Sequence, residues 1–106
     1  MPWVIAFHEL AEAEFLAQPA DIQARLERIR VLVENFGLER LPAKYASHIT
    51  GSLWEFRLKG KDGIARALYV TRSGKRIIIV RVFTKKTQKT PRREIDMALA
   101  RAKEVT

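Results

Sequence analysis

Hydrophobic and polar positions follow a helical period in the first third of this chain. The segment from about Asp21 to Phe36 spaces its apolar residues by three and four, which predicts one amphipathic helix that stops at Gly37. Its stripe comprises Ile22, Leu26, Ile29, Val33 and Phe36. The Ala-, Glu- and Leu-rich segment from His8 to about Gln18 predicts a shorter helix before Pro19, and Trp3–Phe7 predicts a strand. These two helices form a helical hairpin whose stripe must cover an apolar surface.

Beyond residue 52 the period changes to two. Three candidate strands, separated by short Gly-containing turns, cover Leu53–Lys59, Ile64–Thr71 and Arg76–Thr84. Residues 38–52 show no sustained period and are predicted to form a loop. Thr90 and Pro91 fit the N-cap and first position of a last helix, about Arg92–Glu104, with Ile95, Leu99 and Ala102 on one side. The order β-α-α-β-β-β-α predicts one α+β domain over residues 1–106, an antiparallel meander backed by the N-terminal helical hairpin.

The strand pattern also predicts which side chains share a face. If both hairpins turn symmetrically about their two central residues, Arg57 faces Arg66 and Arg66 faces Arg81, so three arginines lie on one rung. The same face carries Glu55, Lys59, Phe83 and Lys85, with Leu53, Leu68, Ile77 and Ile79 at one end. The opposite, apolar face is predicted to be the core under the helices and carries Trp54, Phe56, Leu58, Ala65, Ala67, Tyr69, Ile78, Val80 and Val82.

A rung of three arginines needs a reason, because like charges opposite each other destabilise a sheet. One hypothesis is an anion site, where guanidinium groups bind phosphate oxygens bidentately and Phe83 either stacks on a base or packs against Ile64. The alternative is that Glu55 and other carboxylates neutralise the row, or that a bulge changes the register. The residues that would extend a cationic track beyond the rung are Lys85, Lys86, Lys89, Arg92 and Arg93.

Charge is distributed unevenly along the 106 residues, which carry 20 Lys+Arg, 12 Asp+Glu and a net charge of +8. Residues 1–43 hold four basic and seven acidic residues, whereas residues 44–106 hold sixteen basic and five acidic ones. This asymmetry indicates a polyanionic partner on the C-terminal half, unless the charge only keeps the protein soluble. The longest apolar run, Ile77–Val80, is too short for a membrane span, and early glutamates argue against a signal peptide, so we expect a cytoplasmic protein without membrane contact.

Other kinds of site find little support. Cysteine is absent, and His8 and His48 have no companion at metal-ligand spacing, so neither a metal nor a cofactor is expected. No Gly-rich phosphate loop, nucleophile elbow or carboxylate pair is present. Arg, Lys, Tyr and Glu55 can still support one reaction, in which the 2′-hydroxyl of RNA attacks its own 3′-phosphate. Guanidinium groups stabilise the developing charge, and a lysine crowded by arginines can accept the proton.

Three segments carry a resemblance to a known family. They are Leu53–Arg57, then Gly63–Arg66 with Tyr69, then Phe83–Pro91 with Glu94, Ile95 and Ala98. Together they resemble the RelE/HigB superfamily of bacterial toxins, in particular its phage-derived HigB-like group, over nearly the whole chain. The resemblance implies a RelE-like compact fold and a type II toxin that enters the ribosomal A site and cleaves translated mRNA. It also implies a cognate antitoxin, in this group often a helix-turn-helix protein.

The resemblance further implies roles for single residues. Arg57 and Arg66 match the strand positions that hold the phosphate, Arg81 matches a late-strand arginine that protonates the leaving oxygen, and Lys85 and Lys86 match a lysine pair after the last strand. Residues predicted to bind RNA are Lys59, Phe83, Lys89, Arg92 and Arg93.

RelE itself uses a tyrosine near its C-terminus, whereas this chain has none after Tyr69. The general base is therefore open between Lys85, Lys86 and Glu55. The alternative functions are a noncatalytic RNA- or ribosome-binding module, or an inactive homologue that acts with an antitoxin as a corepressor.

Overall fold

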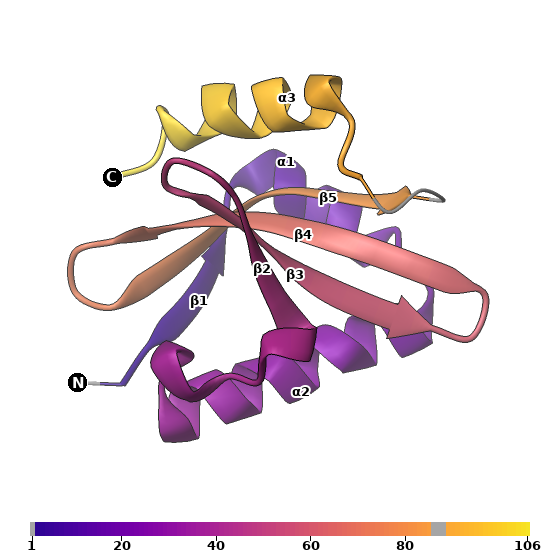
Figure 1. Cartoon of the computed structure of the whole chain (residues 1–106), viewed down its shortest axis with the longest axis horizontal. Helices are drawn as coiled ribbons and strands as arrows, with labels where there is room; N and C mark the ends of the chain where they lie inside the picture. Colours follow the sequence, from indigo (N-terminus) through magenta and orange to yellow (C-terminus); the bar gives the residue numbers. More distant parts are fainter. Residues whose placement is uncertain (1, 86–88) are drawn as a thin grey trace.

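The computed structural model of the chain describes residues 2–85 and 89–106, so the predicted catalytic Lys86 lies outside the described residues. Five strands form one mixed sheet: β1 Val4–Phe7, β2 Ala46–Thr50, β3 Leu53–Gly60, β4 Gly63–Arg72 and β5 Arg76–Lys85. Their order across the sheet is β1-β5-β4-β3-β2 (Figure 1). β1 pairs in parallel with β5, and the other neighbours are antiparallel, which confirms the predicted meander.

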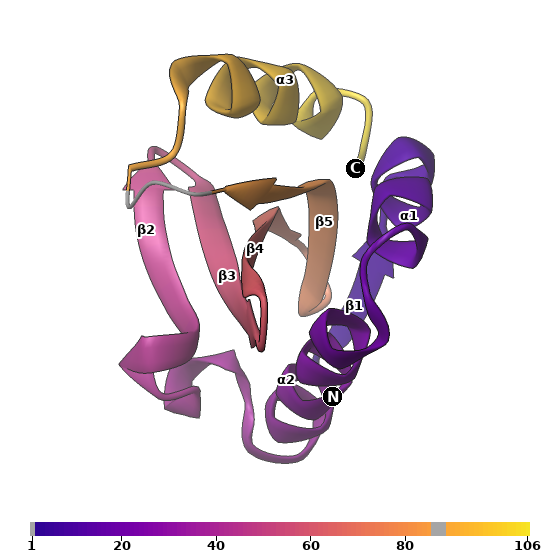
Figure 2. The ribbon, with the colours of Figure 1, turned by 90° about the vertical axis from the view of Figure 1, so that its right-hand side faces the viewer.

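Helices cover both faces of this sheet. α1 (Glu9–Leu16) and α2 (Ala20–Phe36) lie on one face, and α3 (Arg92–Ala102) lies across the other (Figure 2). The helical hairpin is therefore confirmed, as is the stop at Gly37, whose φ of 90° is a left-handed conformation that favours glycine. In the part of the chain that the structure describes, no helix is long and apolar enough to span a membrane.

The prediction of a loop over residues 38–52 is wrong in its second half. Two 3-10 turns, Leu38–Arg40 and Ala43–Tyr45, lead into β2, which pairs with β3 through Ala46↔Phe56 and His48↔Trp54. β2 buries little of its own surface, so its sequence shows no clear alternation. Pairing with β3 stabilises it instead, a contact that a local pattern does not report. The element order thus contains one more strand than predicted.

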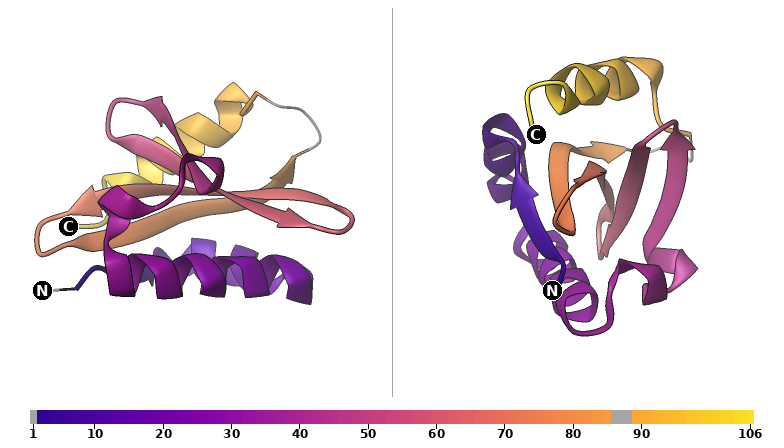
Figure 3. Two further views of the ribbon diagram at one scale, coloured as in Figure 1. Left: turned by 60° about the horizontal axis from the view of Figure 1, so that its bottom comes forward. Right: turned by 90° about the vertical axis from the view of Figure 1, so that its left-hand side faces the viewer.

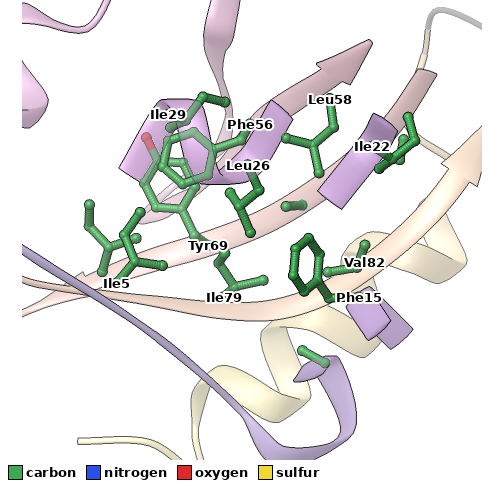
Figure 4. Close-up of a cluster of buried hydrophobic side chains, with 14 of the residues drawn as sticks. Ile5, Phe15, Ile22, Leu26, Ile29, Phe56, Leu58, Tyr69, Ile79 and Val82 are labelled. Carbon is green, nitrogen blue, oxygen red and sulfur yellow. The ribbon is translucent and has the colours of Figure 1, made fainter. Parts of the chain in front are cut away.

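Two separate hydrophobic cores result, one on each face. The first lies between the sheet and the helices α1 and α2, and Figure 4 shows Leu26 and Ile29 beside Phe56 and Tyr69, with Phe15 beside Val82. The second lies under α3 and comprises Leu53, Leu68, Val70, Ile78, Val80, Phe83, Ala98 and Ala102. α3 therefore covers part of the sheet face on which the sequence predicts the arginines. Two predicted core members are exposed, Phe36 by 62% and Trp54 by 41%.

The β4–β5 register differs from the symmetric hairpin. Three residues, Ser73–Lys75, form the turn, with Gly74 and Lys75 at φ of 81° and 57°, so Arg72 pairs with Arg76. A second shift between Leu68 and Tyr69 adds a bulge in β5 around Val80.

The three-residue turn reverses the predicted faces of four β5 residues, and the bulge restores the predicted faces from Arg81 onward. Ile77 and Ile79 lie in the first core, and Ile78 and Val80 lie in the second. Arg66 therefore pairs with Phe83, while Arg81 pairs with Leu68, so the predicted rung of three arginines is wrong.

The last helix also departs from prediction at both ends. Pro91, not Thr90, is the N-cap residue, and α3 ends at Ala102 rather than Glu104. The Thr90 hydroxyl donates a hydrogen bond to Glu55 on β3 instead of capping the helix. A long-range acceptor competes with the local cap here, because a buried carboxylate needs donors.

Candidate functional site: an arginine pair held by one carboxylate

Glu55 on β3 is the centre of a small polar cluster on the sheet. Arg57 and Arg66 face each other across β3 and β4, as predicted. The Glu55 Oε2 atom accepts a hydrogen bond of 2.8 Å from Nη1 of Arg66 and lies 3.9 Å from Nε of Arg57. Ser47 Oγ donates to the same oxygen at 3.1 Å, and Thr90 Oγ1 donates to Oε1 at 3.0 Å. We call Ser47, Glu55, Arg57, Arg66 and Thr90 the Glu55 cluster.

Burial distinguishes the two arginines of the Glu55 cluster. Glu55 and Arg66 are 4% and 6% exposed, whereas the side chain of Arg57 is 38% exposed. Nε of Arg66 is buried and has no acceptor among the described residues. One carboxylate faces two guanidinium groups, so the cluster keeps a positive charge. Arg66 is fixed in position and Arg57 presents that charge to solvent, which suits the binding of an anion.

Arg81 lies on the same face but in different surroundings. Its guanidinium group binds Glu94 through Nε at 2.7 Å and Glu14 through Nη1 at 2.5 Å. Arg101 donates two further bonds of 2.9 Å to the two oxygens of Glu14. We call Glu14, Arg81, Glu94 and Arg101 the Glu14 network. It joins α1, β5 and α3, and both of its arginines are neutralised.

The pKa values of the Glu14 network follow from this pairing. The hydrogen bond to Glu94, together with the charge of Glu14, raises the pKa of Arg81 despite its partial burial. Burial alone would raise the pKa of Glu14, but hydrogen bonds from Arg101 and the Val82 amide, with the arginine charges, lower it overall. The network therefore stays ionised, and its arginines are not free cations.

Both alternatives considered for the predicted rung thus occur together. A bulge separates Arg81 from the line of Arg57 and Arg66, and carboxylates pair with all three arginines. Phe83 is 7% exposed and packs in the second core, with Cζ of Arg81 5.7 Å from its ring centroid. Its ring is therefore part of the packing and not an open surface for a base.

The remaining predicted RNA-binding residues lie at exposed positions on β3 and around the start of α3. Lys59 is exposed on β3. Lys89, Arg92 and Arg93 are exposed before and at the start of α3, where Arg92 forms an ion pair with Asp96 at 3.1 Å. Lys85 ends β5 opposite Ile64.

Sequence reasoning missed the residues that hold the arginines in place. Ser47 lies in the segment predicted to be a loop, and Glu14 lies 67 residues from Arg81, so no local pattern connects them. The two histidines have structural contacts: His8 is the N-cap of α1 and its Nε2 atom lies 2.5 Å from Glu104, and His48 contacts the Gly51 carbonyl. Among the described residues, no group of three His, Cys, Asp or Glu is placed to hold a metal ion.

Comparison with solved structures concerns the fold of the chain. The fold is similar to a free-state structure of the E. coli toxin RelE, a double arginine mutant, with a TM-score of 0.67, 17% identity and coverage of 95% of this chain and 98% of that one. It is also similar to the archaeal RelE–RelB complex from Pyrococcus horikoshii OT3, with a TM-score of 0.54, 19% identity and coverage of 79% and 96%. At these identities the likeness shows the fold alone.

Comparison of the sequence itself identifies one family. A search of curated proteins finds no match. Residues 13–103 match the family described as "Phage derived protein Gp49-like (DUF891)", which covers most of the chain. The predicted RelE-like fold and the predicted phage-derived group are confirmed, and the chain belongs to the phage-derived Gp49-like family.

Proposed function

We propose that this protein is the toxin of a type II toxin–antitoxin system and that it cleaves mRNA on the ribosome. Its family and its RelE-like fold support the class of protein. The observation that carries the reaction is the arginine pair: an exposed Arg57 beside a fixed Arg66 whose Nε has no acceptor among the described residues. Such a pair offers several N–H donors to the oxygens of one phosphate.

The proposed reaction is a metal-independent transesterification. The 2′-oxygen forms a bond to the adjacent phosphorus while the bond from phosphorus to the 5′-oxygen breaks, and the departing 5′-oxygen takes a proton from solvent water. Arg57 and Arg66 would bind the non-bridging oxygens and stabilise the charge that develops on them. Lys85 or Lys86 would accept the proton of the 2′-hydroxyl, because Glu55 already serves as the acceptor for its neighbours.

Other residues of the proposed site act at a distance from the phosphorus. Arg81 is bound by Glu14 and Glu94, so we assign it to holding β5 against α1 and α3 rather than to the leaving oxygen. Phosphates next to the scissile one would be contacted by exposed residues of β3 and the start of α3, namely Lys59, Lys89, Arg92 and Arg93. Phe83 would support Arg81 and the second core.

A cognate antitoxin is part of the proposal. The archaeal RelE structure is a complex with RelB, which supports a protein partner for this fold. A partner that neutralises this protein would bring acidic residues or a helix across the arginine pair, or block entry to the ribosome by its bulk. We expect an adjacent reading frame that encodes a small DNA-binding protein, and its absence would weaken the proposal.

The test is cleavage of a defined mRNA with and without translating ribosomes, mapped by primer extension. We expect cuts only with ribosomes. Replacing Arg57 by Gln should lower cleavage by about 100-fold, the usual loss for one electrostatic donor, with a much smaller fall in ribosome affinity. Lys103→Gln removes the same charge from an exposed position at the end of α3 and is the control.

Each other outcome selects an alternative. A folded protein that binds ribosomes and makes no cuts is a noncatalytic binding module, or an inactive homologue that acts with an antitoxin. Cuts in free RNA would contradict the dependence on ribosomes. An equal, small fall of cleavage and of ribosome affinity in Arg57→Gln would contradict the catalytic role of Arg57.

A further inference from the structure

Basic side chains that lack a carboxylate partner gather at one end of the molecule. In the described part of the chain, the arginines that form ion pairs lie on β5, on α3 and in the Glu55 cluster, together with Arg30 on α2, and His8 contacts Glu104. Five basic residues near the start of α2 and the β3–β4 turn form none: Arg25, Arg28, Lys44, Lys59 and Lys61. Charge without an ion pair therefore lies here, whereas Arg81 is neutralised; exposed Lys75 and Lys103, which also form no ion pair with a described carboxylate, lie at the β4–β5 turn and the end of α3.

Two adjoining hollows lie between these side chains. One has a volume of about 540 Å³ and is lined by Arg25, Arg28, Lys59 and Lys61 among others. The second, of about 380 Å³, shares Arg25 and Lys59 with the first and extends to Lys44, Tyr45 and Arg57. We call the two hollows together the Tyr45 groove. It ends at Arg57, the exposed member of the Glu55 cluster.

Close contact between α2 and the β3–β4 turn builds this groove. Figure 3 shows α2 lying along the sheet, with the β3–β4 and β4–β5 turns at opposite ends. A Cβ atom added at Gly60 would lie 2.7 Å from Oδ2 of Asp21 and from Cδ1 of Ile22, so the turn approaches α2 as closely as glycine permits. The Asp21 carboxylate accepts a hydrogen bond of 2.8 Å from the Lys61 amide.

Asp21 and Tyr45 complete the lining. Of the described residues that line the two hollows, Asp21 alone is acidic, and the backbone amides of Lys61 and Ile22 bind it. Cζ of Arg25 lies 6.0 Å and Nζ of Lys44 lies 5.2 Å from the ring centroid of Tyr45. A hydrogen bond from Arg28 and the charges of Lys44, Arg28 and Arg25 lower the pKa of Tyr45, which is the sign of a positive local potential.

We propose that the Tyr45 groove binds the sugar–phosphate backbone of the RNA strand where it continues past Arg57, and so determines its path on one side of the scissile phosphate. The inference rests on the proposed function, because it takes RNA as the substrate at Arg57. Arg57 Nη1 donates to the Lys44 carbonyl at 3.4 Å, which joins the groove to the Glu55 cluster. Cations thus continue from the proposed site into the groove.

The lining favours RNA over an acidic protein segment. Protein interfaces rely on large apolar anchors, whereas nucleic-acid interfaces are more polar and more positive. The exposed large apolar residues are Val4, Leu10, Leu16, Val31, Phe36, Trp54 and Met97. None of these residues lines either hollow.

The experiment compares two double variants of the full chain. Arg25→Gln with Arg28→Gln removes two charges from the groove, and Lys75→Gln with Lys103→Gln removes two from exposed positions at the β4–β5 turn and the end of α3. Binding to a fluorescent single-stranded RNA is measured by anisotropy over a range of salt concentrations. We expect the groove variant to bind about tenfold more weakly and its salt slope to fall by about 1.4, or 0.7 for each lost phosphate contact. The control should keep the slope of the parent.

Three outcomes would overturn the groove proposal. Equal losses in both double variants would show that only total charge matters. Unchanged RNA binding by the groove variant would contradict the proposal directly. Loss of binding to a polyglutamate peptide with unchanged RNA binding would assign the groove to an acidic polypeptide.

Failure of the proposed function and failure of the groove proposal would give different experimental results. A parent protein that makes no cuts on ribosomes but needs Arg25 and Arg28 to bind RNA defeats the nuclease and supports the groove. Cleavage that persists with groove-independent RNA binding defeats only the groove. RNA bound in the groove should also raise the pKa of Tyr45 toward its usual value, which ultraviolet absorbance can follow, since anionic phosphates would offset the three cations.

Discussion

The Glu14 network and the Tyr45 groove contain similar side chains in opposite electrostatic states. In the Glu14 network, Arg81 and Arg101 each bind a carboxylate through paired or short bonds, and all four side chains are at most 20% exposed. In the Tyr45 groove, the five cations form no ion pair with a described carboxylate and line open hollows. The first arrangement holds three elements together, and the second presents charge to solvent.

This difference shows that net charge along a sequence is not the charge of a surface. The nominally acidic N-terminal segment supplies Glu14, which neutralises Arg81 and Arg101 of the basic segment. The same N-terminal segment supplies Arg25 and Arg28 to the groove. Docking of a polyanion on the C-terminal half alone is therefore too simple an expectation, because folding exchanges charges between the halves.

Removing Glu14 should have the largest effect on stability. Glu14→Ala leaves Arg81 and Arg101 without a shared acceptor, and we expect a loss of about 3 kcal/mol, the lower end for breaking a buried ion pair. Glu12→Ala on the same helix is exposed and is the control, with an expected change within about 0.5 kcal/mol. Urea denaturation measures both. Equal effects of the two variants would mean that the network contributes no stability.

The Glu55 cluster lies between these two extremes, with one carboxylate for two arginines. Glu55→Gln keeps an oxygen for Ser47 or Thr90 but removes the charge that holds Arg66, so we expect a loss of about 2 kcal/mol. Cleavage should fall while nonspecific RNA affinity rises, because the protein gains a positive charge. Cleavage that rises together with RNA affinity would show that charge, and not the position of Arg66, limits the reaction.

The two tyrosines differ in their surroundings, and their pH dependence should differ accordingly. Tyr69 lies in the first core, whereas Tyr45 lies beside the cations of the groove. Burial raises the pKa of Tyr69 above its usual 10.0, so above about pH 10 the unfolded chain loses this proton first and stability falls as pH rises. The decline from this residue is at most about 1.4 kcal/mol per pH unit. Tyr69→Phe should flatten it in urea denaturation at alkaline pH. Tyr45→Phe should not, and should instead remove the ultraviolet transition below pH 10.

The smallest expected effect is on the stability of the groove variant. Arg25→Gln with Arg28→Gln breaks no ion pair among the described residues and removes only the contacts of the two side chains with Tyr45, so we expect a loss of at most about 1 kcal/mol. The groove variant is the counterpart of Glu14→Ala, because it removes charge with little effect on the free energy of unfolding. Destabilisation by more than about 1 kcal/mol would mean that the groove cations stabilise the fold. The groove would then not differ from the Glu14 network in this respect.

The hydrophobic pattern predicts the elements that bury a clear face. The α2 stripe, the hairpin turn at Lys61–Asp62 and the pairing of Arg57 with Arg66 all follow from local spacing, because a two-residue turn sets the register of its own hairpin. β2 escapes prediction because it has no buried face of its own. The Ser73–Lys75 turn and the bulge near Val80 were not predicted. Each inserts a single residue, and the apolar run Ile77–Val80 fits either face of the sheet, so the alternation of apolar and polar positions does not reveal the shift.

By itself, the sequence determined the class of fold, the arginine pair and the overall basic character of the protein. Only the tertiary structure decided which cations are neutralised, because Glu14 meets Arg81 across 67 residues and Thr90 meets Glu55 across 35. It also decided where free charge remains, by bringing α2 against the β3–β4 turn at Gly60. Local spacing fixes which face a side chain takes, whereas the partner of a charge depends on packing between elements that are distant in the chain.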